Sequence, residues 1–281
     1  MQFLQFAHAH GVEIGRLEQG RITRCATTEH PRKKNGAYLF AGDWGWVQDW
    51  ASHVEPVYWQ DDSIVSDEQI ADLKARMEAS RRMHAAERAR EAAEAARKAA
   101  SIINEAKPDL HLYLERKGFP EALGLVWEKD GDRLLVVPMR IGSTVAGCQV
   151  IDADGNKKFM RGQRTNGAEF VIGQTGVDVW CEGYATALSV HSCLAAMKIP
   201  ARVHACFSAG NLQRMARSGV VVADNDPGSC AGIKAAKSTG LPYWLSDSPG
   251  EDFNDFHQRI GTFKAGMELR KFLLGVRRLA A

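Results

Sequence analysis

Five carboxylates in the carboxyl-terminal half of the chain have the type and spacing to bind a divalent cation. They are Glu182, the pair Asp224 and Asp226, and the pair Asp252 and Asp255. Mg²⁺ is commonly held by one or two carboxylates, and the phosphates of a substrate complete its shell. These residues therefore predict metal-assisted phosphoryl or nucleotidyl transfer that uses Mg²⁺ or Mn²⁺. All five are predicted metal ligands.

The elements that must position these carboxylates are predicted from short apolar runs that alternate with helical stretches. Such runs suit buried parallel strands, and the stretches between them suit covering helices. Because ligands bind at the carboxyl ends of the strands in open α/β sheets, the acidic groups should meet at one edge. Any one of these acidic loops could instead be a helix cap or a solvated turn. The predicted strands span residues 177–181, 202–207 and 219–223, and the predicted helices span 186–197, 211–217 and 231–238.

A basic cluster precedes this sheet. Residues 157–164 contain four cations and no carboxylate. Such a cluster can hold template phosphates or the triphosphate of a nucleotide by charge, without base specificity. A solvated hairpin is the alternative. The four cations are Lys157, Lys158, Arg161 and Arg164. The runs 133–138, 147–151 and 170–172 around the cluster are predicted strands of one antiparallel unit.

The amino-terminal part of the chain differs in residue composition. Residues 1–60 contain short apolar runs broken by Gly and Asp, which predicts a small β-rich module. Residues 66–106 lack Gly and Pro and are rich in Ala, Glu and Arg, so we expect one long helix that begins at Ser66 and ends before Pro108. Its mixed charges favour a solvated spacer over a nucleic-acid arm. Alanines at 85, 89, 92, 96 and 99 form a small-residue seam that could pack on another helix.

Composition limits the class of protein. The 281 residues are 45% hydrophobic and 25% charged, which is typical of a folded globular chain. The net charge of +2 does not by itself indicate a nucleic-acid partner. The six cysteines are scattered singly, so we expect reduced thiols. No long apolar stretch and no secretory signal are visible, and we expect a cytoplasmic protein without a membrane partner.

Several motifs together resemble the Toprim domain of bacterial DnaG-type primases, topoisomerases and some nucleases. The glutamate of Val-Trp-Cys-Glu182-Gly and the aspartates of Val-Ala-Asp224-Asn-Asp226 carry this resemblance. The chain is more similar still to the Toprim primases of phages and conjugative plasmids. That resemblance covers roughly residues 110–260 and adds Tyr113-Leu-Glu-Arg-Lys-Gly118, Pro138-Met139, Gly147-Cys-Gln149, Gly155-Asn-Lys157, Phe207-Ser-Ala-Gly-Asn211 and Asp252-Phe-Asn-Asp255.

The resemblance implies a role for these residues. In that family the glutamate and the two aspartates bind metal and serve nucleotide transfer, which implies that Glu182, Asp224 and Asp226 are the catalytic residues. Asp252 and Asp255 are expected to be further acidic contributors. Asn211 is expected to contact nucleic acid or nucleotide. Single-stranded DNA template, ribonucleoside triphosphates and a separate replicative helicase are the implied partners.

The segment from Arg24 to Tyr38, followed by Gly45-Trp46, resembles the zinc ribbon at the front of phage-type primases. A structural zinc needs four ligands, usually in two close pairs. Cys25 and His30 could form one pair, but no second pair follows, so we expect a degenerate module without zinc. Its basic residues and tryptophans could still hold single strands by charge and stacking. The basic residues are Arg32, Lys33 and Lys34.

We therefore expect an α/β protein with a Toprim parallel sheet flanked by helices. The expected segments are a β-rich module at 1–60, a helical spacer at 61–107, a basic primase-core subdomain at 108–175, the Toprim domain at 176–262 and a basic carboxyl-terminal helix at 263–281. The expected function is that of a phage- or plasmid-type DNA primase that makes short RNA on single-stranded DNA. A Toprim nuclease and a nucleic-acid-binding replication accessory protein without synthesis are the alternatives.

Overall fold

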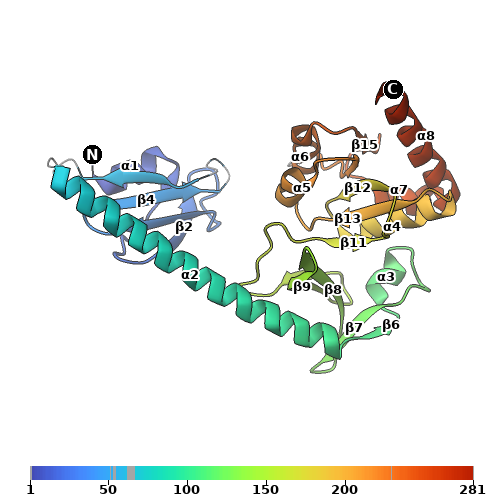
Figure 1. Cartoon of the computed structure of the whole chain (residues 1–281), viewed down its shortest axis with the longest axis horizontal. Helices are drawn as coiled ribbons and strands as arrows, with labels where there is room; N and C mark the ends of the chain where they lie inside the picture. Colours follow the sequence, from blue (N-terminus) through green and yellow to red (C-terminus); the bar gives the residue numbers. More distant parts are fainter. Residues whose placement is uncertain (1, 51, 53–54, 62–66, 229, 281) are drawn as a thin grey trace. The chain divides into compact units, whose positions relative to one another are not determined.

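The computed structural model describes residues 2–50, 52, 55–61, 67–228 and 230–280 (Figure 1). The chain divides into two compact units, residues 1–86 and 87–281. The boundary falls inside the long helix α2 (Asp67–Glu105). The predicted helix is therefore present, although its expected start at Ser66 lies outside the described residues. The finer division into five segments stays a prediction.

The first unit is an antiparallel sheet with a short helix, α1 (Phe3–Ala9), against it. Its strands follow one another in chain order, as a β-meander. Phe3, Tyr38, Val47 and Trp59 fill its core. Trp44 and Trp59, two of the tryptophans offered for base stacking, are therefore packing residues, whereas Trp50 is 44% exposed. The strands are β1 (Val12–Glu13), β2 (Thr23–Thr27), β3 (Gly36–Phe40), β4 (Trp44–Asp49) and β5 (Val57–Gln60).

The second unit begins with an antiparallel sheet, which we call the front sheet. Its strand order is β10-β9-β8-β7-β6. The helix α3 (Leu112–Arg116) and the start of a later helix pack on one face, through Tyr113, Leu114 and Tyr184. The strands are β6 (Lys107–Asp109), β7 (Gly124–Lys129), β8 (Asp132–Ile141), β9 (Thr144–Ile151) and β10 (Lys157–Phe159).

The carboxyl-terminal half of α2 covers the other face of the front sheet. Ala99 is fully buried there and Ala95 is 3% exposed, whereas Ala85 and Ala89 are exposed. Of the seam predicted to pack on another helix, Ala99 packs on strands, against Val136 and other residues of the front sheet. For Ala99 the prediction was wrong about the partner, because small residues permit close approach to a sheet as readily as to a helix.

The second sheet of this unit, which we call the parallel sheet, has the strand order β11-β13-β12-β14-β15. Strands β12 (Val177–Cys181), β13 (Ala201–Ala205), β14 (Val220–Ala223) and β15 (Tyr243–Leu245) are parallel, and β11 (Phe170–Ile172) is an antiparallel edge. The three predicted parallel strands are confirmed. The assignment of residues 170–172 to the antiparallel unit was wrong, because β11 pairs with β13.

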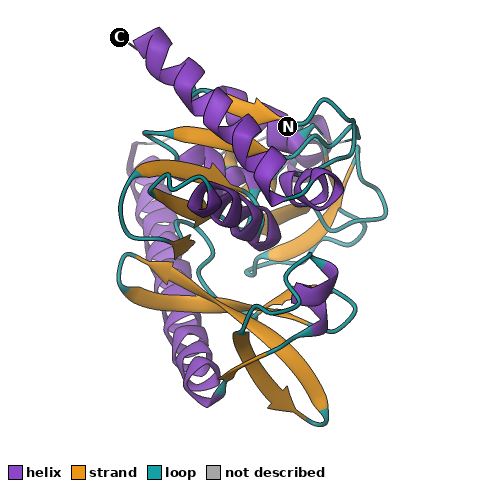
Figure 2. Cartoon of the chain, turned by 90° about the vertical axis from the view of Figure 1, so that its right-hand side faces the viewer, coloured by secondary structure: helices purple, strands orange, loops and turns teal. Residues whose placement is uncertain are grey.

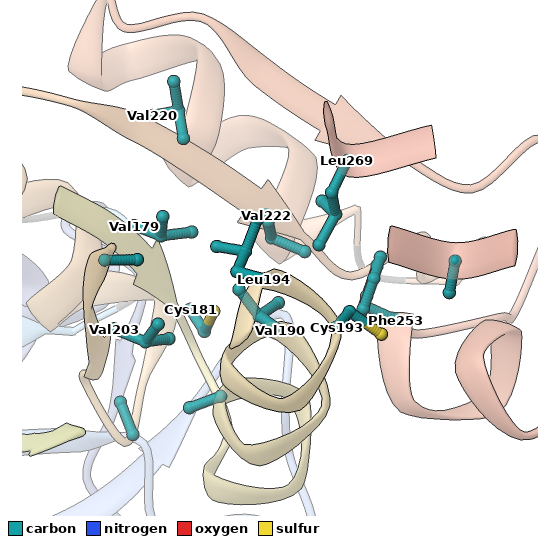
Figure 3. Packing of buried hydrophobic residues seen from close by; sticks show 14 residues of the cluster. Val179, Cys181, Val190, Cys193, Leu194, Val203, Val220, Val222, Phe253 and Leu269 are labelled. Carbon is teal, nitrogen blue, oxygen red and sulfur yellow. The ribbon is translucent and has the colours of Figure 1, made fainter. Parts of the chain in front are cut away.

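The strands of the parallel sheet are mainly apolar, apart from Asp178, Arg202 and His204, because helices cover both faces of the sheet (Figure 2). Val179, Val222 and their neighbours face α4 (Tyr184–Ala196), α7 (Phe253–Ile260) and α8 (Thr262–Ala280), as Figure 3 shows. The alternate residues Trp180 and Val221 face α5 (Ala209–Met215) and α6 (Ala231–Thr239). Pleating puts successive side chains on opposite faces.

The molecule is thus a mixed α/β protein. The chain leaves β12 toward β13 on one side and then crosses to β14 on the other. This reversal is a topological switch point, and open α/β sheets bind ligands outside the carboxyl ends of the strands at such a point. Among the described residues, no helix combines the length and apolar character that a bilayer crossing requires.

Candidate functional site

Glu182 lies at the carboxyl end of β12, at the switch point. Its carbonyl oxygen accepts a hydrogen bond from Phe207 N at 2.8 Å, which ties β12 to the loop after β13. Its carboxylate accepts a hydrogen bond from the backbone N–H of Ala209. Burial nevertheless raises the pKa of Glu182, and the nearby carboxylate of Asp226 raises it further. The side chain is therefore held where negative charge is concentrated.

Asp224 follows the adjacent strand β14. The pairing of Cys181 with Val222 brings the ends of the two strands side by side. Burial raises the pKa of Asp224 to about 7, and the carboxylates of Asp252, Glu182 and Asp226 contribute to the rise. One oxygen of Asp224 is buried without a hydrogen-bonding partner among the described residues. This carboxylate therefore has an unmet need for a cation or a donor.

Two neighbours fix the loop that carries Asp224. Gly232 lies in the first turn of α6, where this helix packs against the loop. A Cβ atom at position 232 would lie 2.8 Å from the carbonyl oxygen of Asp224. The amide of Asn225 donates to the carbonyls of Ser246 at 2.8 Å and Ser248 at 3.2 Å. Asn225 thereby fastens the Asp224 loop to the loop that leads to Asp252.

Asp252 and Asp255 lie at the start of α7. Asp252 caps this helix by accepting a hydrogen bond from Asp255 N at 2.8 Å. Its charge acts on Asp224, as described above, so Asp252 belongs to the same acidic group. Asp255 is exposed, and its carboxylate lies 4.0 Å from Lys117 Nζ. The two residues are therefore not equivalent, because Asp252 acts on Asp224, whereas Asp255 lies at the solvent-exposed rim of the acidic group.

The acidic group fits a hard divalent cation in its chemistry. All its donors are carboxylate oxygens, which Mg²⁺ and Mn²⁺ prefer. The unpartnered oxygen of Asp224 is a candidate ligand. Within the described part of the chain, no three His, Cys, Asp or Glu side chains converge closely enough to hold one ion by themselves. A cation here would therefore take part of its shell from substrate or water.

Lys157 brings positive charge to these carboxylates from the front sheet. It lies on β10, and its Nζ atom is 5.8 Å from the centroid of the Tyr113 ring. Partial burial and the nearby Lys117 ammonium lower the pKa of Lys157, while the carboxylates of Asp252, Asp224 and Glu182 oppose that shift. The site therefore combines acid from one sheet with base from the other.

The basic cluster that the sequence predicts as one group is divided by the structure. Lys158 is adjacent to Lys157 on a strand, so the two side chains leave opposite faces. The charge of Lys158 acts on Asp152, in the turn before β10. Arg161 and Arg164 are exposed in the following loop, and Arg164 donates to the carbonyl of Asn166 at 3.4 Å. Only Lys157 stands among the carboxylates, and a nucleic-acid role for the other three stays a prediction.

Asn211, predicted to bind nucleic acid or nucleotide, is 6% exposed. Its amide nitrogen donates to the carbonyls of Thr165, Cys206 and Ala168, at 2.7, 3.0 and 3.2 Å. Its amide oxygen accepts from Gly167 N at 3.1 Å. With both ends engaged, Asn211 holds the loop after β10 against the parallel sheet. In this structure its surroundings give it a positioning role.

The basic residues predicted in the first unit are exposed on the loop between β2 and β3. They are Arg32, Lys33 and Lys34. Beside this loop, Arg24 donates to the carbonyl of Lys34 at 2.8 Å and lies 3.9 Å from the Trp50 ring centroid. Cys25 is buried in the core of the unit, and this burial raises the pKa of its thiol to about 11. Its surroundings therefore favour a packing role for Cys25.

Sequence reasoning missed three residues near the carboxylates. Lys117 stands beside Asp255, and Tyr113 lies beneath Lys157. Asn254 is fully buried and donates to the carbonyl of Lys117 at 2.8 Å and to Ser189 Oγ at 2.9 Å. Tyr113, Lys117 and Asn254 all lie within motifs that carried the family resemblance, which was the available signal.

Comparison with known proteins shows a distant relation to a primase. The chain is similar to the DNA primase TraC of Escherichia coli, with 28% identity over 200 residues. The match covers 62% of this chain and 18% of that protein, so the chain corresponds to a small part of its relative. No family model matches. The similarity therefore supports a primase-like relation for this part of the chain.

Proposed function

We propose that this chain is a Toprim-type DNA primase, which synthesises short RNA primers on single-stranded DNA by metal-dependent nucleotidyl transfer. One observation carries the proposal. Glu182 and Asp224 follow adjacent parallel strands at a topological switch point, where the charges of Asp226 and Asp252 act on the same group. The similarity to a DNA primase agrees with this chemistry.

Each residue receives a role from its position. Glu182, Asp224 and Asp226 would hold Mg²⁺ or Mn²⁺, and Asp252 would add negative charge to that group. The metal would polarise the α-phosphate and offset charge on the departing pyrophosphate. Lys157 would pair with nucleotide phosphates, because its ammonium faces the carboxylates from the front sheet. Asp255 would contribute at the rim by orienting Lys117.

The chain's other basic groups would bind the template by charge. Arg161 and Arg164 are exposed on the loop that follows β10, and the Arg32 to Lys34 loop is exposed on the first unit. Such contacts hold the phosphate backbone without reading its sequence. Ribonucleoside triphosphates and single-stranded DNA are therefore the proposed ligands, and a separate replicative helicase is the proposed partner in phage or plasmid replication.

Primer synthesis is tested by incubating the protein with single-stranded DNA, labelled ribonucleotides and Mg²⁺ or Mn²⁺. Labelled oligoribonucleotides that disappear in Asp224→Asn would support the proposal. Shortening of the template would instead indicate a Toprim nuclease, which uses the same carboxylates to admit water. Binding of the strand without synthesis or cleavage would indicate a replication accessory protein. Synthesis that survives both Asp224→Asn and Glu182→Gln would remove the carboxylates from the mechanism.

A further inference from the structure

The hydroxyl of Tyr113 has no hydrogen-bonding partner within the described part of the chain. Tyr113 is only 3% exposed, so water does not readily replace that partner. Buried hydroxyls in folded proteins are nearly always paired, and an unpaired one needs an explanation. One carboxylate oxygen of Asp224 is likewise buried without a hydrogen-bonding partner among the described residues. Two unmet polar atoms thus belong to the region of the carboxylates.

The position of Tyr113 connects it with the acidic group. It stands in the first turn of α3 and packs with Tyr184 and Ala185, which begin α4 immediately after Glu182 and Gly183. Lys157 Nζ lies over its ring, as given above. The charge of Asp252 acts on both Tyr113 and Asp224. Tyr113 is therefore close to Asp252, which is one of the three carboxylates that act on Lys157.

The chemistry of the hydroxyl limits what it can bind. Burial raises the pKa of Tyr113 above its ordinary value, with a further contribution from Asp252, so the phenol keeps its proton at neutral pH. A protonated phenol is an available O–H donor. A donor beside an ammonium group suits an anionic oxygen, because charge-assisted hydrogen bonds are the stronger ones. A phosphate oxygen is such an acceptor.

We propose that the Tyr113 hydroxyl is a substrate contact, which donates a hydrogen bond to a phosphate oxygen of a nucleotide bound at the carboxylates. This inference rests on the proposed function. The hydroxyl is covered in the ligand-free chain, so side chains must move when the nucleotide enters. Lys157 lies over the ring, so it is one of the side chains that would turn toward the phosphate.

The test is Tyr113→Phe, which removes one oxygen atom and keeps the ring. ATP with Mg²⁺ is titrated by calorimetry, separately from primer synthesis. We expect the Kd for ATP to rise about tenfold, which is the effect of losing one such bond. The thermal midpoint should stay the same or rise, because the variant no longer buries an unpaired hydroxyl. A weaker affinity for ATP without a loss of thermal stability distinguishes a substrate contact from a structural one.

Tyr38→Phe is the matched control. The Tyr38 hydroxyl is paired, since it donates to the carbonyl of Arg16 at 2.9 Å and accepts from Glu18 N at 2.9 Å. Its loss should lower the thermal midpoint of the first unit and leave the Kd for ATP unchanged. An unchanged Kd in Tyr113→Phe would overturn the inference, whatever its midpoint.

The two proposals fail in different ways. A wild-type chain that binds ATP but makes no primers would refute the proposed function, and the Tyr113 contact would still be decided by the Kd of the variant. A wild-type chain that does not bind ATP at all would overturn both.

Discussion

Replacing Asp224 by Asn should make the fold more stable while abolishing primer synthesis. The folded chain raises the pKa of Asp224 from 3.8 to about 7. A shift of roughly three units corresponds to about 4 kcal/mol at most. Because the side chain keeps some contact with water, we expect about 2 kcal/mol. For a unit of this size, the thermal midpoint should then rise by about 4 to 8 °C.

The pH dependence gives the sign of this effect. The folded state keeps the proton on Asp224 up to about pH 7, whereas the unfolded chain loses it near the ordinary pKa of 3.8. The folded state therefore binds more protons between these values, and the wild type loses stability as the pH rises through this window. The advantage of Asp224→Asn should be absent below about pH 4, grow across the window and become constant above pH 7.

Differential scanning calorimetry from pH 4 to 8.5 measures this difference. Asp154→Asn, on an exposed turn, is the matched control and should shift the midpoint little at any pH. Mg²⁺ at about 100 times its Kd should stabilise the wild type by about 2.7 kcal/mol at pH 8, and the variant by less. A variant that is less stable than wild type at pH 8, or a difference that does not change with pH, would refute the electrostatic reasoning.

Three further outcomes follow from the geometry. Lys157→Met should raise the KM for nucleotide about tenfold, whereas Lys158→Met, on the opposite face of β10, should leave it nearly unchanged; equal effects in steady-state kinetics would contradict the division of the basic cluster. Asn254→Leu should destabilise the chain by about 3 kcal/mol in urea unfolding, because the Lys117 carbonyl and the Ser189 hydroxyl both lose a donor; a loss below about 1 kcal/mol would mean that water replaces the amide. Neutralising three exposed cations together, Arg32, Lys33 and Lys34, should weaken binding of single-stranded DNA. The slope of log K against log salt should fall in magnitude by about 2, and an unchanged slope in a fluorescence titration would exclude contact between these cations and the strand.

The parallel sheet could be predicted because its sequence pattern has a single physical cause. Strands covered on both faces are apolar at most positions, and helical stretches of suitable length separate them. The acidic residues after β12 and β14 then meet because parallel strands end at one edge. Sequence analysis also proposed Asp252, but its capping of α7 and its distinction from Asp255 depend on the tertiary position of that helix.

Other elements could not be predicted, because their neighbours are distant in sequence. Residues 170–172 form a short apolar run that suits a strand of either sheet, and only the position of β13 assigns them to the parallel sheet. The alanines of α2 are compatible with several partners, and the strands of the front sheet are the ones present. Charge spacing grouped Lys157 with Lys158, but the pleat of a short strand separates them.

The acidic and basic halves of the site come from different sheets, so buried polar contacts between the sheets must hold them together. Asn254 lies two residues after Asp252 and binds the carbonyl of Lys117, which belongs to the turn after α3. Asn211 binds the loop after β10 in the same way. Both amides donate to backbone carbonyls, so they fix the position of the chain and leave the charged side chains free to follow a ligand. Nucleotide affinity should therefore depend on two amides that need not touch the nucleotide.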